Sequence, residues 1–222
     1  MGYLHNGVKT GGVPIDFIKR FVDAYDIKIF IETGTAGGQS AQDAAAIFES
    51  VHTIEIVEGR SNVLCPENVS FYIGDSSKLL KTIAAPFKGQ RIVFWLDAHW
   101  SEPYESPEGV NECPVLEEIA SIKGHDALVL IDDARLFFGA HPYPGDPRKW
   151  PNFQKVFAYL RESFPKHEIT IVDDYIIAIP DYMRDTFHVE WRERFKERYP
   201  EAIDRVKTEM RNSLEYLKEF VR

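Results

Sequence analysis

The sequence of 222 residues has few cysteines and no long apolar run. Its two cysteines, Cys65 and Cys113, are far apart and each precedes a proline, which gives neither metal-site spacing nor a disulfide framework. No apolar stretch approaches the length of a membrane span, and the first residues lack the apolar core of a signal peptide. We therefore expect a cytoplasmic protein without a membrane partner.

Positive charge is also scarce. The chain has 26 Lys and Arg against 35 Asp and Glu, a formal net charge of −9. It lacks the basic stripe that duplex nucleic-acid binders usually carry, so we do not expect a nucleic-acid partner. A small or cationic ligand suits this charge better, and the length is sufficient for one sizeable domain with its own core.

Seven short apolar runs predict β-strands. They cover residues 27–32, 51–57, 69–74, 91–97, 127–132, 167–173 and 175–180. The first five are apolar on both faces, as in a parallel sheet covered by helices. Helical patterns occupy 14–25, 40–50, 76–85, 113–123 and 152–164. This alternation predicts an open α/β sheet with helices on both faces.

The last two strand-like runs differ from the others because only Asp174 separates them clearly. They predict a hairpin that places an antiparallel strand at the sheet edge. A dinucleotide-binding fold would continue with a parallel sixth strand, whereas this ending resembles the Rossmann-like class I methyltransferase fold, whose seventh strand is antiparallel. We predict one such domain over residues 1–182, with a mostly parallel seven-stranded sheet.

The C-terminal segment, residues 183–222, is highly charged but patterned. Apolar residues recur at spacings of three and four, at Ile203, Val206, Met210, Leu214, Leu217 and Val221. This spacing predicts a helical extension with one apolar face. We expect that face to pack on the chain's own domain, and a homodimer contact is the alternative.

A glycine turn follows the first predicted strand, with Glu32 two residues before Gly34. Ligands of open α/β sheets bind beyond the carboxyl ends of the strands, where this turn lies. Its pattern, G-x-x-G-G, differs from the G-x-G-x-x-G of NAD sites, and a carboxylate there would repel a pyrophosphate. S-adenosylmethionine (SAM) has no phosphate and carries a positive ammonium and sulfonium, so Glu32 favours SAM.

Further acidic residues follow the next two strands. Glu55 comes 21 residues after Gly34, at about the spacing at which an acid accepts hydrogen bonds from ribose hydroxyls, and Glu58 is the competing candidate. Asp75 ends the third strand, where an aspartate can reach an adenine amino group. Each alone is more often a solvated charge or a helix cap, but their order at successive strand ends favours a cofactor site.

These motifs together resemble a known family. E-T-G-T-x-x-G-x-S, T-I-E, G-D-S, F-W-L-D-A-H-W-S, E-C-P-V-L-E-E-I and I-D-D-A-R are similar to class I SAM-dependent methyltransferases, in particular macrocin/mycinamicin-type sugar O-methyltransferases and more distantly catechol-type enzymes. The resemblance covers roughly residues 14 to 180, although residues 58–68 are short where relatives place a helix. The cofactor-binding residues that it implies are Glu32, Gly34, Thr35, Gly37, Gly38, Ser40, Glu55, Asp75, Ser76 and Asp97.

An acidic cluster is expected where the fourth and fifth strands end, at Asp97, Asp132 and Asp133. Neighbouring strands lie about 4.8 Å apart, so the three carboxylates would converge. A divalent cation such as Mg²⁺ would neutralise them, and the resemblance implies a metal that binds substrate hydroxyls at these strand ends. Alternatively, Asp97 caps a turn or holds the methionine ammonium, and Asp132 or Asp133 pairs with Arg135.

His99 lies two residues after Asp97 and is a candidate general base, since its ordinary pKa is near neutrality. A metal-side ligand and a structural histidine are the alternatives, and His141 is a weaker candidate base. Two long loops, 100–112 and 135–152, follow these strands. Their aromatic residues are expected to line a substrate pocket, or else to pin the loops to the domain: Trp100, Tyr104, Phe137, Phe138, Tyr143 and Trp150.

The sequence therefore predicts a SAM-dependent O-methyltransferase, with a divalent metal, acting on a small-molecule substrate such as a sugar. An NAD-dependent oxidoreductase is the first alternative, and the departure from the NAD fingerprint argues against it. A catalytically silent SAM-binding protein is the second, because fold does not imply function.

Overall fold

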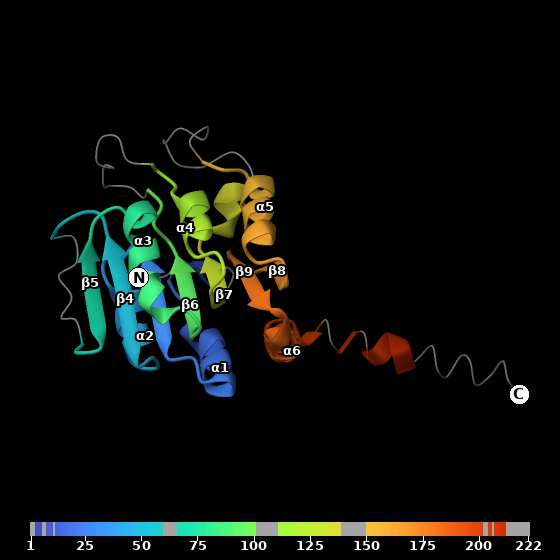
Figure 1. Ribbon diagram of the computed structural model, residues 1–222. Helices are drawn as coiled ribbons and strands as arrows, with labels where there is room; N and C mark the ends of the chain where they lie inside the picture. The colour runs from blue at the N-terminus through green and yellow to red at the C-terminus, as the bar shows by residue number, and fades with distance from the viewer. Residues whose placement is uncertain are drawn as a thin grey trace, which may run out of the picture. The chain divides into compact units, whose positions relative to one another are not determined.

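The computed structural model describes residues 3–5, 8–10, 12–59, 66–100, 111–138, 150–201, 204–205 and 207–211. The chain divides into two compact units, Met1–Met183 and Arg184–Arg222. The first unit contains the sheet and the candidate site (Figure 1).

The first unit is built on a seven-stranded sheet. Its strands are β3 (Ile29–Thr33), β4 (Ser50–Glu55), β5 (Val69–Ile73), β6 (Arg91–Leu96), β7 (Asp126–Ile131), β8 (His167–Val172) and β9 (Tyr175–Pro180). They lie in the order β5-β4-β3-β6-β7-β9-β8. Strands β3 to β7 are parallel to one another, and β9 is antiparallel to both β7 and β8. This arrangement is the Rossmann-like class I methyltransferase fold that the apolar runs predict.

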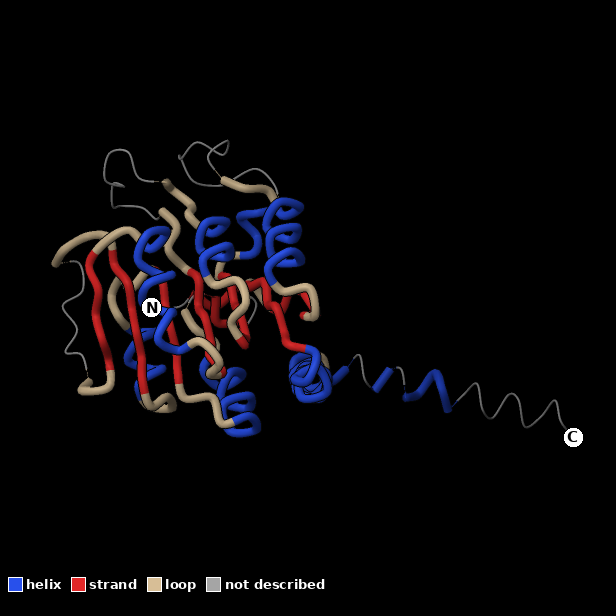
Figure 2. The backbone as a smooth tube through the Cα atoms, in the orientation of Figure 1, coloured by secondary structure: helices blue, strands red, loops and turns tan. Residues whose placement is uncertain are grey.

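Helices cover both faces of this sheet (Figure 2). They are α1 (Ile15–Tyr25), α2 (Gln39–Ala45), α3 (Ser76–Ala84), α4 (Val115–Ser121) and α5 (Phe153–Ser163), with the short 3₁₀ turns η1 (Ala85–Phe87), η2 (Ala134–Phe137) and η4 (Asp181–Met183). Each of the five helical patterns in the sequence gives one of these α-helices. Leu80 of α3, Ile119 of α4 and Leu160 of α5 share one apolar cluster with Phe94 and Val129, so these three helices cover one face.

Aromatic side chains fill the opposite face. Successive side chains of a strand point to opposite faces, so Trp95 points away from its neighbour Phe94. The ring of Tyr175 lies 6.3 Å from that of Trp95 and 6.0 Å from that of Phe17, which belongs to α1. Because the side chains of a strand alternate between two buried faces, a parallel strand that is covered on both sides appears as a continuous apolar run in the sequence.

The C-terminal hairpin corrects one prediction. We expected the antiparallel strand at the sheet edge, but β9 lies between β7 and β8, and β8 is the edge strand. All six residues of β9 are buried, whereas five of the six in β8 are only partly buried. The uniformly apolar strand therefore takes the interior position, and the strand that alternates polar and apolar residues takes the edge. The turn has two residues, Asp173 and Asp174, with Asp173 in the left-handed region at a φ of 53°.

Two further strands, β1 (Tyr3–His5) and β2 (Val8–Thr10), form a separate antiparallel pair that the sequence patterns did not predict. Both are three residues long, which is too short to show a period of two.

The second unit begins with α6 (Arg184–Arg198), a helix rich in charged residues. Of the apolar face predicted in this unit, Met210 is described and is 62% exposed. The other five predicted positions, from Ile203 to Val221, lie outside the described residues. The packing or dimer role of the extension stays a prediction.

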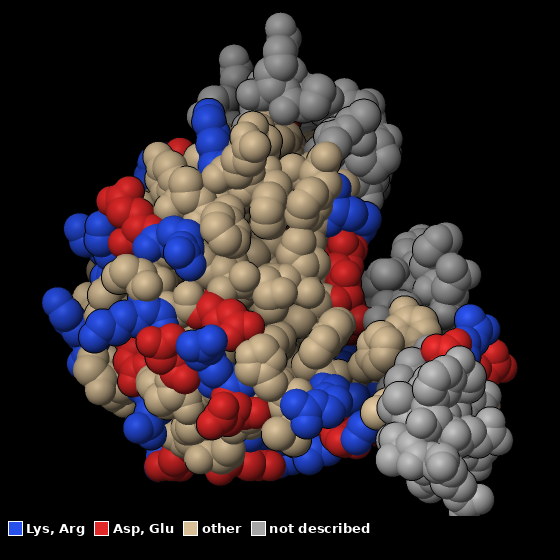
Figure 3. Space-filling model, turned by 90° about the vertical axis from the view of Figure 1, so that its right-hand side faces the viewer, with Lys and Arg blue, Asp and Glu red and all other residues tan. Residues whose placement is uncertain are grey.

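No helix among the described residues is long and apolar enough to cross a membrane. Figure 3 shows Lys and Arg interspersed with Asp and Glu on the described residues of one face, around an area without charged side chains.

Candidate cofactor and proton-transfer site

The glycine turn lies where the winding of the sheet changes direction. Strands β4 and β5 extend from β3 on one side, and β6 and β7 extend on the other. Open α/β sheets bind ligands beyond the carboxyl ends of strands at this kind of switch point. Gly34 directly follows β3 at a φ of +83°, and a Cβ there would run into the backbone carbonyl of Asp97. Glycine is therefore needed at this position, and it brings the ends of β3 and β6 close together.

Glu32 is buried beside this turn and is 1% exposed. Its Oε2 accepts a 2.6 Å hydrogen bond from Thr53, whose hydroxyl also lies 2.5 Å from that of Thr35. Burial raises the pKa of Glu32 to about 8, although the hydroxyls of Thr53 and Ser40 oppose the shift. The carboxylates Asp97 and Glu55 raise the pKa further. A cation bound beside Glu32 would favour its ionised form, because it would offset the cost of burying the negative charge.

Glu55 is the predicted ribose-binding candidate that the structure brings to the turn. It is 2% exposed, accepts a 2.8 Å hydrogen bond from the backbone N–H of Ala36 and accepts another at 3.0 Å from Val57. Ala36 adopts a left-handed φ of 46°, which is uncommon for a residue with a Cβ. Glu58 is exposed. Glu55 therefore holds the turn in shape, and its role toward a ribose stays a prediction.

Asp75 caps the N-terminus of α3. A helix cap is the alternative role that the sequence analysis gives for it beside an adenine contact. Its Oδ1 accepts hydrogen bonds from the backbone N–H and the hydroxyl of Ser77, and Lys78 lies 2.9 Å from its Oδ2. Partial burial opposes the charged form, but Ser77 and Lys78 lower the pKa of Asp75. Ser76, the first residue of α3, is buried, and its hydroxyl opposes the rise in the pKa of Glu118 that burial causes.

Among the other predicted cofactor residues, Thr35 is buried in the turn, and Gly38 precedes α2 with a φ of 79°. A side chain at Gly37 would meet nothing within 4 Å. Ser40 accepts a 3.4 Å hydrogen bond from the backbone N–H of Val13.

His99 joins the ends of β6 and β7. Its Nε2 lies 3.1 Å from Oδ1 of Asp97 and 3.0 Å from Oδ2 of Asp133, although neither contact has hydrogen-bond alignment. Burial disfavours the charged imidazole, but Asp133 and Asp97 outweigh it, so the pKa of His99 is raised well above its ordinary value. The ring of Trp150 packs 5.3 Å from the His99 ring. His99 therefore lies between two carboxylates, those of Asp97 and Asp133.

The three predicted metal ligands are in different environments. Asp133 faces both His99 and Arg135, and despite burial these two partners lower its pKa to about 2. Burial raises the pKa of Asp97, while burial and the neighbouring Asp97 and Asp133 raise that of Asp132 well above its ordinary value. Asp132 accepts a hydrogen bond from the backbone N–H of Asp133, and Arg135 also pairs with Asp174.

The predicted metal set does not fit this arrangement. In the part of the chain that the structure describes, no group of three or more His, Cys, Asp or Glu side chains is placed to hold a metal ion. Arg135 pairs with Asp133, as the ion-pair alternative anticipated. His99, which that alternative did not include, lies between Asp97 and Asp133 and balances their negative charge when it is protonated.

The aromatic residues of the two long loops, 100–112 and 135–152, lie in different environments. Trp150 is 8% exposed and packs against His99 and Phe137, whereas Phe138 is 55% exposed and stacks on Phe153. The backbone N–H of Trp100 donates to the carbonyl of Glu112. Tyr104, His141 and Tyr143 lie outside the described residues.

Sequence reasoning missed two polar residues of this region, Thr53 and Glu118. Thr53 lies inside an apolar strand, where a hydroxyl gives no distinctive signal. Glu118 had a usable signal, because it lies three residues after Val115 and four before Ile122, on the core-facing stripe of its helix. A glutamate on that stripe predicts a buried carboxyl group.

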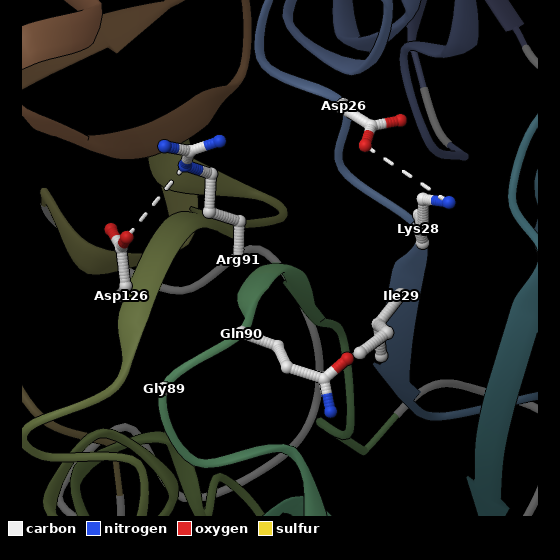
Figure 4. Close-up of a pocket in the computed structure, with 7 residues that line it drawn as sticks. All are labelled: Asp26, Lys28, Ile29, Gly89, Gln90, Arg91 and Asp126. Carbon is white, nitrogen blue, oxygen red and sulfur yellow. Dashed lines mark ion pairs between the residues drawn. The ribbon is translucent and has the colours of Figure 1, made fainter.

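A cavity of about 360 Å³ lies at the opposite end of the sheet, where β3, β6 and β7 begin (Figure 4). It is lined by Asp26, Lys28, Ile29, Gly89, Gln90, Arg91 and Asp126. Its charged side chains are paired, Lys28 with Asp26 at 4.0 Å and Arg91 with Asp126 at 3.9 Å. The first pair lies between the end of α1 and the start of β3, and the second joins the first residues of β6 and β7. Both are far from the glycine turn.

No protein-family model and no curated protein matches the sequence. Several similar solved structures are methyltransferases, the family that the motifs resemble. A candidate caffeoyl-CoA O-methyltransferase from Staphylococcus aureus is 19% identical over 75% of this chain and 82% of its own, with a TM-score of 0.48. The mycinamycin-pathway methyltransferase MycE, solved with Mg, SAH and mycinamycin VI, is 13% identical with a TM-score of 0.42, over 74% of this chain and 45% of its own.

An NAD⁺ complex is also among the similar structures. The Bordetella bronchiseptica enzyme WbmH is 14% identical over 62% of this chain and 53% of its own, with a TM-score of 0.41. At these identities and TM-scores the likenesses concern the arrangement of strands and helices, and they leave the reaction open.

Proposed function

We propose that this protein is a SAM-dependent methyltransferase that acts on a hydroxyl group of a sugar or another small polyhydroxylated molecule. The observation that carries the proposal is Glu32, a fully buried carboxyl group at the switch point of the sheet. The hydroxyls of Thr53 and Ser40 lower its pKa, and the carboxylates of Asp97 and Glu55 raise it. Such a site attracts a cationic ligand and repels a pyrophosphate.

The neighbouring residues support a methyl donor that carries an adenosine. Glu55 lies at the end of β4, where an acidic residue binds ribose hydroxyls in related sheets, and it also holds the backbone of the glycine turn. In this proposal the ammonium and sulfonium of SAM lie toward Glu32, and its ribose lies toward Glu55.

The reaction also needs a proton acceptor, which His99 supplies in this proposal. His99 would accept the proton of the substrate hydroxyl. SAM, held at Glu32 and Glu55, would supply the methyl group to the hydroxyl oxygen and leave as the neutral thioether. Asp97 and Asp133 stabilise the imidazolium that forms, since both lie within 3.1 Å of Nε2.

In this proposal Trp150 contacts the methyl acceptor, because its ring lies against both His99 and Phe137. Trp150→Ala is expected to reduce turnover at least about tenfold and to leave the Kd for SAM within about twofold, since the lost contact is on the acceptor side. Tyr159→Ala, which removes an exposed aromatic side chain on α5, is the matched control. Turnover in Trp150→Ala equal to that of the control would contradict the assignment, and thermal unfolding would identify a variant that has lost its fold.

The acidic cluster led us to expect metal dependence, but a metal is not part of this proposal. Carboxylates suit Mg²⁺, but His99 and Arg135 already balance Asp97 and Asp133, so no step of the reaction above requires a metal. Protein treated with EDTA and then desalted is therefore expected to keep most of its turnover. A loss of turnover that added Mg²⁺ restores would assign the metal a role and overturn His99 as the sole proton acceptor.

The function itself is tested by calorimetric titration of SAM and, separately, of NAD into the purified protein. Binding of SAM without binding of NAD supports the proposal, and binding of NAD alone would replace it with an oxidoreductase. Mass spectrometry of a panel of sugars and polyols incubated with SAM then looks for a gain of one methyl group. SAM binding without any methylated product would favour a catalytically silent SAM-binding protein.

A further inference from the structure

Thr53 is a buried hydroxyl residue to which the reaction proposed above gives no role. It is fully buried within β4, and its partner on β3 in the parallel pairing is Glu32. Paired residues of neighbouring strands point to the same face of a sheet, so the two side chains lie side by side. A buried hydroxyl is destabilising compared with an apolar side chain of the same shape, unless it is hydrogen-bonded.

The hydroxyl of Thr53 makes two short hydrogen bonds. It donates to Oε2 of Glu32 at 2.6 Å, and its oxygen lies 2.5 Å from the hydroxyl oxygen of Thr35. A hydroxyl group has one proton to donate and two lone pairs that accept. Because Thr53 gives its proton to Glu32, the proton of the second bond must come from Thr35. The two threonines therefore form a directed chain of donors, from Thr35 to Thr53 to the carboxylate.

The glycine turn brings Thr35 to this chain. The backbone N–H groups of Gly34 and Thr35 both donate to the carbonyl of Ile54, at 2.9 and 3.2 Å. Ile54 follows Thr53 on β4, so these two bonds draw the turn from the end of β3 toward the neighbouring strand. Thr35 is 4% exposed there. The backbone of two strands and the turn therefore fixes both hydroxyls beside Glu32.

The hydroxyl chain acts against the charged surroundings of Glu32. In the described part of the chain, the charged groups that act on Glu32 are Asp97, directly after β6, and Glu55, at the end of β4. Both are carboxylates, so they disfavour the ionised form of Glu32. A hydroxyl donor favours that form, since hydrogen bonds to ionised groups are stronger than those to neutral groups.

We propose that Thr53 is a positioning residue, which together with Thr35 holds the carboxylate of Glu32 in place to face the cationic part of SAM. This proposal rests on the proposed function. Thr53 touches neither SAM nor the methyl acceptor in it, because its one proton is directed to Glu32, and it acts through that carboxylate.

The test compares two substitutions of opposite character at this position. Thr53→Val keeps the shape of the side chain and removes the hydroxyl, whereas Thr53→Ser keeps the hydroxyl and removes the methyl group. We expect the Val variant to bind SAM about tenfold more weakly at pH 7, because Glu32 loses a hydrogen bond to its charged form. The Ser variant should bind within about threefold of the wild type, and the exposed control Thr82→Val on α3 should bind as the wild type does. A role in packing alone gives the reverse order, since valine fills the site and serine leaves a small cavity.

Infrared spectroscopy of the free protein gives a second readout that needs no ligand. The carbonyl stretch of protonated carboxyl groups is followed against pH, and the band that Glu32→Gln removes belongs to Glu32. Its midpoint is expected to move up by about one pH unit in Thr53→Val, which corresponds to the tenfold change in affinity. It should move up less in Thr35→Val, which removes only the second donor, and stay in place in Thr53→Ser and Thr82→Val.

A double variant shows whether Thr53 acts through the carboxylate. Once Glu32→Gln has removed the charge, adding Thr53→Val should weaken SAM binding by less than about twofold, because two residues of one connection are not additive. A further tenfold loss in the double variant would mean that Thr53 acts on SAM by another route, and the positioning role would be wrong.

The outcomes separate the two proposals. If the wild type does not bind SAM, the proposed function fails, and the infrared midpoints still decide whether Thr53 acts on Glu32. An unchanged midpoint in Thr53→Val would overturn the positioning role. If Thr53→Val does not fold, Thr35→Val decides, since an unchanged midpoint and unchanged SAM affinity there would contradict the proposal.

Discussion

Glu32→Gln is expected to raise the Kd for SAM about a hundredfold while leaving the fold intact. The substitution keeps the size of the side chain and an acceptor for the hydroxyl of Thr53, but it removes the charge. Removing one partner of a buried charge pair is strongly destabilising, because the other charge is left without compensation, and here that charge belongs to the ligand. Calorimetry measures the Kd, and thermal unfolding checks the fold.

The same carboxyl group makes SAM binding depend on pH. The pKa of Glu32 is raised to about 8 in the free protein, so the group is mostly protonated at neutral pH. It must release that proton to pair with a cation, and binding therefore strengthens as pH rises. Between pH 6 and pH 7.5 the Kd should fall by close to tenfold per pH unit, the limit for one released proton. Buffers with different ionisation enthalpies would count the proton directly.

The control for this experiment is Glu58→Gln, which changes an exposed glutamate near the end of β4. It should leave both the Kd and its pH dependence unchanged, whereas Glu32→Gln should abolish the pH dependence over this range. S-adenosylhomocysteine adds a further comparison, because it lacks the sulfonium charge. A Glu32→Gln variant that binds SAM as tightly as the wild type, with the same pH dependence, would refute the role of Glu32 as the partner of a cationic ligand.

The fold was largely predictable because five of the seven strands are largely buried on both faces. Such strands appear as continuous apolar runs, and all seven runs became strands of one sheet. The order within the C-terminal hairpin was harder to predict, since a hairpin can join the sheet through either strand. The burial of 175–180 compared with 167–172 decides it, and that difference was visible as uniform against alternating polarity.

The candidate site was predictable only in part. Strand ends in a parallel sheet meet at one edge, so the convergence of Glu32, Asp97 and Asp133 follows from sequence position. The partner of each carboxylate cannot be predicted from sequence position. A change of about 1 Å in the distance between two charged groups is enough to separate an ion pair from a solvated charge. Only the structure shows that His99 lies between Asp97 and Asp133, the carboxylates that a metal was expected to neutralise.

His99 is expected to have the largest effect on turnover. His99→Gln should lower kcat by about 10²- to 10⁴-fold, which is the usual contribution of a positioned general base. The Kd for SAM should change little, because the residue that faces the cation in this proposal is Glu32. A variant with normal kcat would exclude His99 as the proton acceptor, and one that loses SAM binding and turnover together would indicate a structural role.

The pH dependence of turnover identifies the proton acceptor more sharply. His99 accepts a proton only when it is neutral, and Asp133 and Asp97 raise its pKa well above the ordinary value. Turnover should therefore rise with pH through and above neutrality. Asp133→Asn removes one of the two carboxylates that hold the imidazolium, so the pKa of His99 should fall and the rise in turnover should move to lower pH. Asp26→Asn, at the opposite end of the sheet, should leave the profile in place. An Asp133→Asn profile that coincides with that of the wild type would mean that the group which limits turnover is not paired with Asp133, and His99 would then lose its assignment as the base.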